Sequence, residues 1–102
     1  MANIEILEEV KETIWVKIPP LYNVVLHNDD KTTFEFVILI LSTIFYKTIE
    51  EPVNLAHHIH ENGSAVVGGP YTHEIALEKV NETISLARAN GFPLQASLEE
   101  TE

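Results

Sequence analysis

The stretch Tyr22–Val37, YNVVLHNDDKTTFEFV, decides the fold of this chain. The apolar, Val-rich run Leu21–His27 predicts a strand, and the polar run Asn28–Thr32 that follows it predicts a turn. A threonine hydroxyl at position 32 or 33 can accept from exposed backbone amides and so cap a helix that begins at Phe34. Three small polar side chains at such a strand–helix junction can cap the helix, or they can hold a cationic group from a partner.

The rest of the chain predicts alternating helices and strands. Phe34–Tyr46 is apolar nearly all round, which favours a largely buried helix. Pro52 stands in the first turn of the next helix, where proline is tolerated, and Asn-Gly pairs are typical helix ends. After the first strand, three helices are predicted: from 34 to 46, from a Thr48 cap to about His60, and from a Thr72 cap to Asn90. Two further strands are predicted over 64–67 and 93–98, and the first of these ends in a turn at 68–70. Residues 99–102 are predicted to form a frayed acidic tail. The apolar stripe of the third helix is predicted at Ile75, Ala76, Val80, Ile84 and Ala87.

This order, β-α-α-β-α-β, predicts an α+β domain with helices packed on a small sheet. Pro19-Pro20 cannot continue a helix and marks a boundary. The residues before it mix helical and strand-like spacing. The sequence therefore predicts a flexible N-terminal extension over residues 1–20 and one compact domain over residues 21–102.

Composition narrows the class of protein. The chain has 102 residues, no cysteine and a net charge of −10. The missing cationic surface argues against nucleic-acid binding and against an anionic membrane, whereas a positively charged partner would be steered in. No apolar run approaches the ~20 residues that span a bilayer, and the acidic N-terminus does not resemble a secretory signal. We therefore expect a cytoplasmic protein, most simply a monomer.

Histidines and acidic residues offer a weak case for catalysis. His57 and His60 share a helix face because they are three residues apart, and with His73 they could build a metal-dependent hydrolase. No HExxH or related motif accompanies them. Asp29 and Asp30 could act as paired carboxylates with His60 as a base, but no candidate nucleophile is present. The sequence predicts no enzyme, no metal and no cofactor.

A binding site is the better functional interpretation. Asp30 can accept from an ammonium group, Asn28 supplies an acceptor and donors, and His60 can accept through one ring nitrogen. Apolar positions at i,i+3 spacing on two helices would form walls beside them: Phe34 and Val37 on the first, Ala56 and Ile59 on the second. The structural alternative is that these apolar residues are ordinary core and that Asn-Asp-Asp is a common turn.

The segment Leu21–Ile38 closely resembles the signature of the ClpS adaptor family, and so does HENGSAVVG at His60–Gly68. The helix start at Thr72–Lys79 and Pro93-Leu94 also fall where that family has them. This resemblance implies a small three-stranded antiparallel sheet packed on three helices. It also implies an adaptor that binds N-degron (N-end rule) substrates through a free α-amino group and a large N-terminal Leu, Phe, Tyr or Trp. The substrates would pass to an AAA+ ATPase of the ClpA or ClpC type for degradation by ClpP.

The resemblance also assigns roles to residues. Asn28, Asp30 and His60 match the positions that hold the α-amino group. Thr32 matches the pocket edge, and Val37, Ile59 and Leu94 match pocket walls. Glu74 and Lys79 match positions that dock on the ATPase N-domain, and residues 1–20 match an extension that the ATPase engages during hand-over.

Three departures from the family pattern stand out. Phe34 and Ala56 occupy positions where methionines commonly gate and line the pocket, and a stiff ring with a small methyl group predicts a reshaped pocket. Gly69-Pro70-Tyr71 carries one extra residue, which predicts a different second strand–helix junction. The altered pocket leaves one alternative open, a ClpS-like modulator that binds the ATPase and inhibits or redirects other substrates without N-degron delivery.

Overall fold

The computed structural model describes residues 19–48 and 50–101, so most of the predicted extension over residues 1–20 lies outside the described residues. The centre of the fold is strand β1 (Tyr22–His27), which pairs antiparallel with β2 (Ser64–Tyr71) on one side and β3 (Gln95–Glu100) on the other. The predicted order β-α-α-β-α-β is confirmed, and so is the three-stranded antiparallel sheet.

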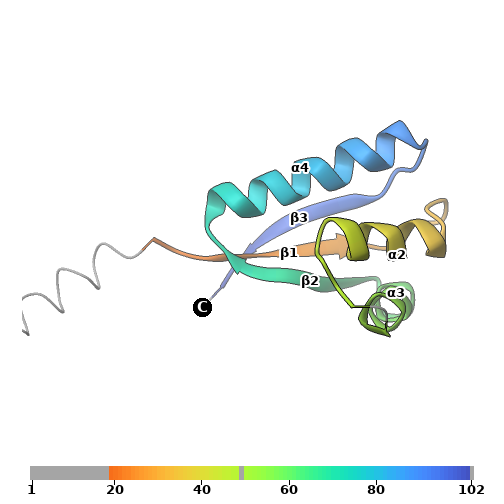
Figure 1. The fold of residues 1–102 in the computed structure, drawn as a ribbon, viewed down its shortest axis with the longest axis horizontal. Coiled ribbons are helices and arrows are strands. Elements are labelled where there is room, and N and C mark those ends of the chain that lie inside the picture. The colour runs from red at the N-terminus through yellow and green to blue at the C-terminus, as the bar shows by residue number, and fades with distance from the viewer. Residues whose placement is uncertain (1–18, 49, 102) are drawn as a thin grey trace, which may run out of the picture.

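Three helices pack on this sheet (Figure 1). Helix α4 (His73–Ala89) lies along the sheet and contacts all three strands, whereas α2 (Phe34–Thr43) packs on α3 (Glu50–Asn62), which in turn contacts β2. Two threonines begin helices as expected: the Thr33 hydroxyl accepts from Phe36 N–H at 3.2 Å, and the Thr72 hydroxyl accepts from Ile75 N–H at 3.3 Å. At the start of α3, the Thr48 carbonyl accepts from Glu51 N–H.

The core forms between the sheet and the helices. Val24 and Leu26 point from β1 into the same buried cluster as Ile40 and Leu41 of α2. The stripe of α4 is buried at Ala76, Val80 and Ala87 and half-buried at Ile84, but the prediction for Ile75 is wrong because 46% of that side chain is exposed. Thr83 is buried instead, and its hydroxyl donates to the Lys79 carbonyl, which satisfies it inside the helix.

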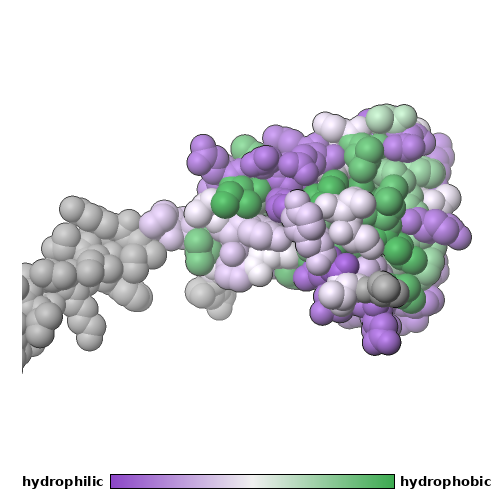
Figure 2. All heavy atoms as spheres, viewed as in Figure 1, coloured by the Kyte–Doolittle hydropathy of each residue, from purple (hydrophilic) through white to green (hydrophobic). Residues whose placement is uncertain are grey.

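The end of one helix differs from the sequence expectation, and the end of another agrees with it. Helix α2 ends at Thr43 rather than Tyr46, with Ile44 as its C-cap. Tyr46 has φ +54°, a left-handed conformation that stops an α-helix. Helix α3 ends at Asn62, and Gly63, at φ +88°, turns the chain into β2, so the predicted stop at Asn62-Gly63 is confirmed. Figure 2 shows hydrophobic surface on the side of α2, between the hydrophilic outer surfaces of α4 and α3.

Strand β2 is longer than predicted, and the prediction of a plain turn at Gly68-Gly69-Pro70 is wrong. These residues continue the strand to Tyr71, and two register shifts against β1 each insert one extra residue into β2. The bulge needs glycine: a Cβ on Gly68 would lie 2.7 Å from Phe45 Cδ1, and one on Gly69 would lie 2.9 Å from the Tyr22 carbonyl oxygen. The segment before α4 is therefore a bulged strand end.

Strand β3 is shifted relative to the prediction of a strand over Pro93–Leu98 and a frayed tail. It starts at Gln95, and Glu99 and Glu100 pair with Asn23 and Tyr22. Thr101 N–H then donates to the Leu21 carbonyl at 2.8 Å. The side chains of Glu99 and Glu100 are charged, but their backbone groups complete the hydrogen-bond ladder of β1. The acidic composition of this segment does not reveal that pairing. Within residues 19–48 and 50–101, no helix is long and apolar enough to cross a membrane.

Gly69→Ala should destabilise the fold more than Gly63→Ala. Both positions have positive φ, +124° and +88°, so each alanine costs about 1–2 kcal/mol of backbone strain. Only the Gly69 methyl also meets the Tyr22 carbonyl, which adds at least about 1 kcal/mol of overpacking. Urea unfolding followed by far-ultraviolet circular dichroism measures both changes in the free energy of unfolding. Equal losses for the two variants would contradict the bulge geometry.

Candidate functional site

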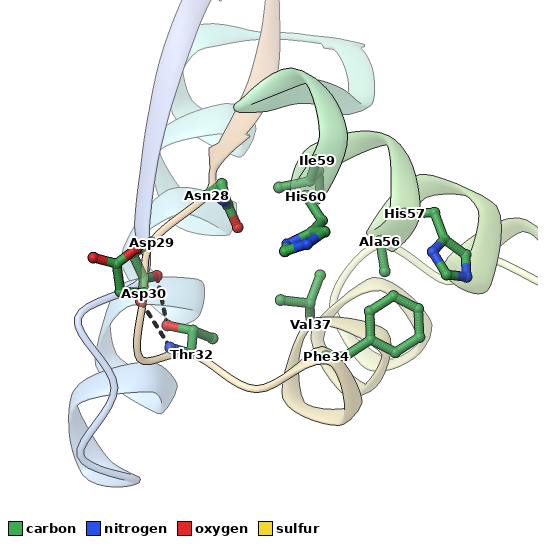
Figure 3. A pocket seen from close by; sticks show the side chains of 10 residues that line it. All are labelled: Asn28, Asp29, Asp30, Thr32, Phe34, Val37, Ala56, His57, Ile59 and His60. Atoms are coloured by element: carbon green, nitrogen blue, oxygen red, sulfur yellow. Dashed lines mark hydrogen bonds between the residues drawn. The ribbon is translucent and has the colours of Figure 1, made fainter.

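One backbone hydrogen bond joins the two halves of the site. The Asn28 N–H, just after β1, donates to the Gly63 carbonyl at 2.8 Å, and the Gly63 N–H in turn donates to the Ile59 carbonyl at 2.9 Å. The end of β1 is thereby fixed to the C-terminal end of α3. Because His60 lies on that last turn of α3, the polar residues after β1 and this imidazole come to the same place (Figure 3).

Asp29 shapes the loop between β1 and α2. One of its carboxylate oxygens accepts from the backbone N–H of Lys31 at 2.8 Å and of Thr32 at 2.7 Å, and the other accepts from the Thr32 hydroxyl at 2.6 Å. Burial alone would raise the pKa of Asp29. The hydrogen bonds from Thr32 and Lys31, with the charge of Arg88 nearby, outweigh burial and hold this pKa below its usual value of 3.8.

The loop, α2 and α3 enclose a pocket of about 470 Å³, within the range of small-ligand sites. Its apolar walls come from buried side chains of both helices, Val37 on α2 and Ala56 and Ile59 on α3. Its residues are Asn28, Asp29, Asp30, Thr32, Phe34, Val37, Ala56, His57, Ile59 and His60. The fold therefore brings together most of the residues that the sequence predicted for the binding site.

Three of these residues, Asn28, Asp30 and His60, form the polar rim of the pocket. Figure 3 shows the Asn28 amide and the His60 ring directed toward the same opening. All three are exposed, and the hydrogen bonds found among the described residues leave their side-chain groups unoccupied. A carboxylate, an amide oxygen and a ring nitrogen are acceptors, so the rim suits a ligand with a cationic donor group.

Not every predicted pocket residue lies here. Thr32 and Phe34 do line the pocket, at the loop and at the first residue of α2. Leu94 does not: it is 1% exposed within the core, and its carbonyl accepts from Arg88 Nη1 at 2.8 Å. That position comes just before β3, whose pairing to β1 draws it inward.

Glu74 and Lys79 lie on α4, away from the pocket, and on different sides of the helix. Glu74 is exposed in the first turn. Lys79 is half-buried because its ammonium group donates to the Ile44 carbonyl at 2.8 Å and lies 4.7 Å from the centre of the Tyr46 ring. Five residues correspond to about 140° of rotation around an α-helix, so the two side chains do not meet.

The three histidines considered as metal ligands do not come together in the described part of the chain. The His73 ring packs edge-on against Tyr22, with ring centroids 5.0 Å apart, at the start of β1. His57 and His60 lie on α3, near the opposite end of that strand. Among residues 19–48 and 50–101 no three His, Cys, Asp or Glu side chains are grouped so that they could hold a metal ion. The hydrolase alternative thus lacks its ligand set in this part of the chain.

Comparison with known proteins identifies a family and a fold for this chain. The family model described as ATP-dependent Clp protease adaptor protein ClpS matches residues 17–97. The ClpS adapter of Nautilia profundicola is 47% identical over 91 residues, which cover 89% of this chain and 93% of the relative. The ClpS adapter of Campylobacter jejuni is 43% identical over 100 residues, 98% and 99% of the two chains.

A solved structure extends the likeness to three dimensions. ClpS2 of Agrobacterium tumefaciens, determined with bound L-phenylalaninamide, superimposes with a TM-score of 0.78 at 36% identity, covering 82% of this chain and 100% of that chain. This chain belongs to the ClpS family of adaptors for ATP-dependent Clp proteases. It is a non-catalytic protein, an adaptor that delivers N-end rule substrates.

The sequence did not assign Asp29 or His57 a specific role in the binding site, although both line the pocket. The signal for Asp29 was its place three residues before Thr32, the spacing at which an acidic side chain reaches forward to the amides of the following loop residues. In the structure, the Asp29 carboxylate holds the loop through its hydrogen bonds to Lys31 and Thr32.

Asp29→Asn should destabilise the protein near neutral pH, and the deficit should shrink as the pH falls below 3.8. The folded-state pKa of Asp29 is lowered, so its stabilisation is present above the unfolded-state value and is lost as the carboxylate is protonated. Urea unfolding at several pH values measures this difference. Asp30→Asn is the matched control, because it removes a neighbouring charge but none of these hydrogen bonds. The same pH dependence in both variants would point to net charge instead.

Proposed function

We propose that the pocket binds the N-terminal residue of N-degron proteins. The polar rim of Asn28, Asp30 and His60 would hold the free α-amino group, and the apolar walls would take a Leu, Phe, Tyr or Trp side chain. The observation that carries this proposal is the set of three unoccupied polar side chains at the opening of an apolar pocket. The rim offers acceptors to a cation, and Val37, Ala56 and Ile59 offer apolar walls to a side chain.

The chemistry of an N-terminus fits this division. A free α-amino group has a reference pKa near ~8 and is largely cationic at neutral pH, so its hydrogen bonds to Asp30 would be charge-assisted. Burying a Leu or Phe side chain contributes about 1.5–3 kcal/mol, well short of the roughly 8 kcal/mol of micromolar binding. Both terms are needed, and only a large apolar residue at a free N-terminus supplies both.

The ligand of the Agrobacterium relative supports the same assignment. L-Phenylalaninamide carries a free α-amino group beside a benzyl side chain, and ClpS2 binds it. The present chain shares the fold of that protein at 36% identity. A ligand with these two groups would place its ammonium at the rim and its ring between Val37, Ala56 and Ile59.

For the partner, we propose the N-domain of a ClpA- or ClpC-type AAA+ ATPase, which would receive the substrate in the cytoplasm for degradation by ClpP. Glu74 and Lys79 would dock on it, and residues 1–20 would be engaged during hand-over. The support is the family relationship and the exposed, charged outer surface of α4 (Figure 2). A surface on α4 would leave the pocket between α2 and α3 open while the adaptor, as a monomer, is docked.

Asp30→Ala should weaken binding of N-degron peptides by about ten- to a hundred-fold, because hydrogen bonds to a charged group contribute roughly 1.5–3 kcal/mol. Fluorescence anisotropy of labelled peptides that begin with Leu, Phe, Tyr or Trp measures the dissociation constants. Acetyl-Phe peptide should bind as poorly, since acetylation removes both the charge and donors. Glu35→Ala, an exposed acidic residue outside the pocket lining, is the control.

Binding that survives acetylation would contradict the assigned role of the rim. No binding of any of the four free peptides, together with intact binding to the ATPase, would favour the modulator alternative. The altered wall at Phe34 and Ala56 is the observation that keeps this alternative in view.

Glu74→Lys should lower the affinity for the ATPase N-domain several-fold, while the free energy of unfolding falls by no more than about 1 kcal/mol, because Glu74 is exposed and its main interaction in the fold is with the dipole of α4. Mutation of a charge at an interface rim chiefly slows association, so surface plasmon resonance is the measurement. Glu99→Lys makes the same change of net charge on β3 and is the control. Lys79→Ala should act on stability as well, since it removes the donor to the Ile44 carbonyl. Equal effects of Glu74→Lys and Glu99→Lys would place docking elsewhere.

A further inference from the structure

Phe34 and His57 form an aromatic pair across the edge of the pocket. Their ring centroids are 4.7 Å apart and the rings are inclined at 50°, within the range in which aromatic rings attract one another. Phe34 is the first residue of α2 and His57 lies on α3, and both line the pocket. The pair therefore bridges the two helices that supply the pocket walls.

The Phe34 ring needs such a partner to hold its position. Its backbone is fixed, because Thr33 caps α2, but 36% of the residue is exposed and the core does not enclose it. An exposed side chain exchanges among rotamers. Figure 3 shows the Phe34 ring beside His57, with the Ala56 methyl group directed toward it. Ala56 leaves room for the ring, and His57 supplies the face against which it rests.

Helix α3 spaces these contacts regularly. His57 and His60 are three residues apart, with Ala56 and Ile59 on the wall between the two helices. One histidine is thus directed to the polar rim and the other to Phe34, so the same helix serves both ends of the pocket.

We propose that His57 is a positioning residue that sets the selectivity of the pocket by fixing the Phe34 ring at its edge. This inference rests on the proposed function of the pocket and deepens it. A ring held in one place narrows the opening close to the backbone of the ligand. Side chains that branch at Cβ, those of Ile and Val, are widest there and are excluded, whereas Phe and Leu pass with a single methylene. A ring that is free to move would admit both branched and unbranched side chains.

His57→Ala should reduce the preference for N-terminal Phe over N-terminal Ile by about two- to ten-fold, the range expected from one aromatic pair. Anisotropy with matched Phe, Leu and Ile peptides gives the ratio of dissociation constants. His57→Phe should restore the ratio, because it keeps an aromatic face. His58→Ala is the control, since His58 is the next residue on the helix, contacts Asn62 and does not line this pocket.

A double-mutant cycle separates positioning from direct contact. In a Phe34→Leu background, where no ring is left to fix, His57→Ala should leave the Phe-to-Ile ratio unchanged. Urea unfolding of each variant shows whether the fold is intact. Normal peptide binding with an unchanged ratio in His57→Ala, or an equal effect in the Phe34→Leu background, would overturn the role of His57 alone. A wild-type protein that binds none of the peptides would overturn the proposed function and this inference together.

Discussion

The site depends on one backbone constraint, the hydrogen bond from the Asn28 N–H to the Gly63 carbonyl. A single bond of this kind stabilises a fold only modestly, but here it decides geometry. Gly63 ends α3 in a left-handed conformation that side chains rarely adopt, which lets its carbonyl face the end of β1. Without this close approach, the loop after β1 and His60 would belong to separate surfaces. The polar rim therefore exists because a strand end and a helix end share one contact.

The loop is organised so that its two carboxylates have different tasks. Asp29 uses its oxygens on Lys31 and Thr32, so it is committed within the protein. Asp30 is exposed, and the hydrogen bonds described for the loop leave its carboxylate free for a ligand. A carboxylate that already accepts from two backbone amides and a hydroxyl has little capacity left for an ammonium group, so a second acidic residue serves that task better. The pair Asp-Asp thus separates the shape of the loop from recognition of the charge.

The sequence predicted the element order, the caps at Thr33 and Thr72, and most of the pocket, because turn chemistry and helical spacing are local properties. It failed where pairing between distant strands decides the outcome. The sequence predicted a turn over residues 68–70, but pairing with β1 makes them part of a bulged strand that ends at Tyr71. The acidic end of the chain read as frayed, although β1 supplies backbone partners for it. The Phe34–His57 contact joins two helices, and no spacing within either helix indicates it.

Helix α2 connects the two surfaces of the molecule. Its N-terminal end carries Phe34 at the edge of the pocket, and its C-terminal end receives the ammonium group of Lys79 from α4 at the Ile44 carbonyl. The cap at Thr33 and this contact fix the helix at both ends. A wall held in this way cannot move to admit a poorly fitting side chain without losing one of the two anchors. Selectivity among ligand side chains then has to come from groups at the edge of the pocket that the core does not hold. Among the pocket residues on α2, Phe34 is the exposed one. Its ring rests against His57 of α3.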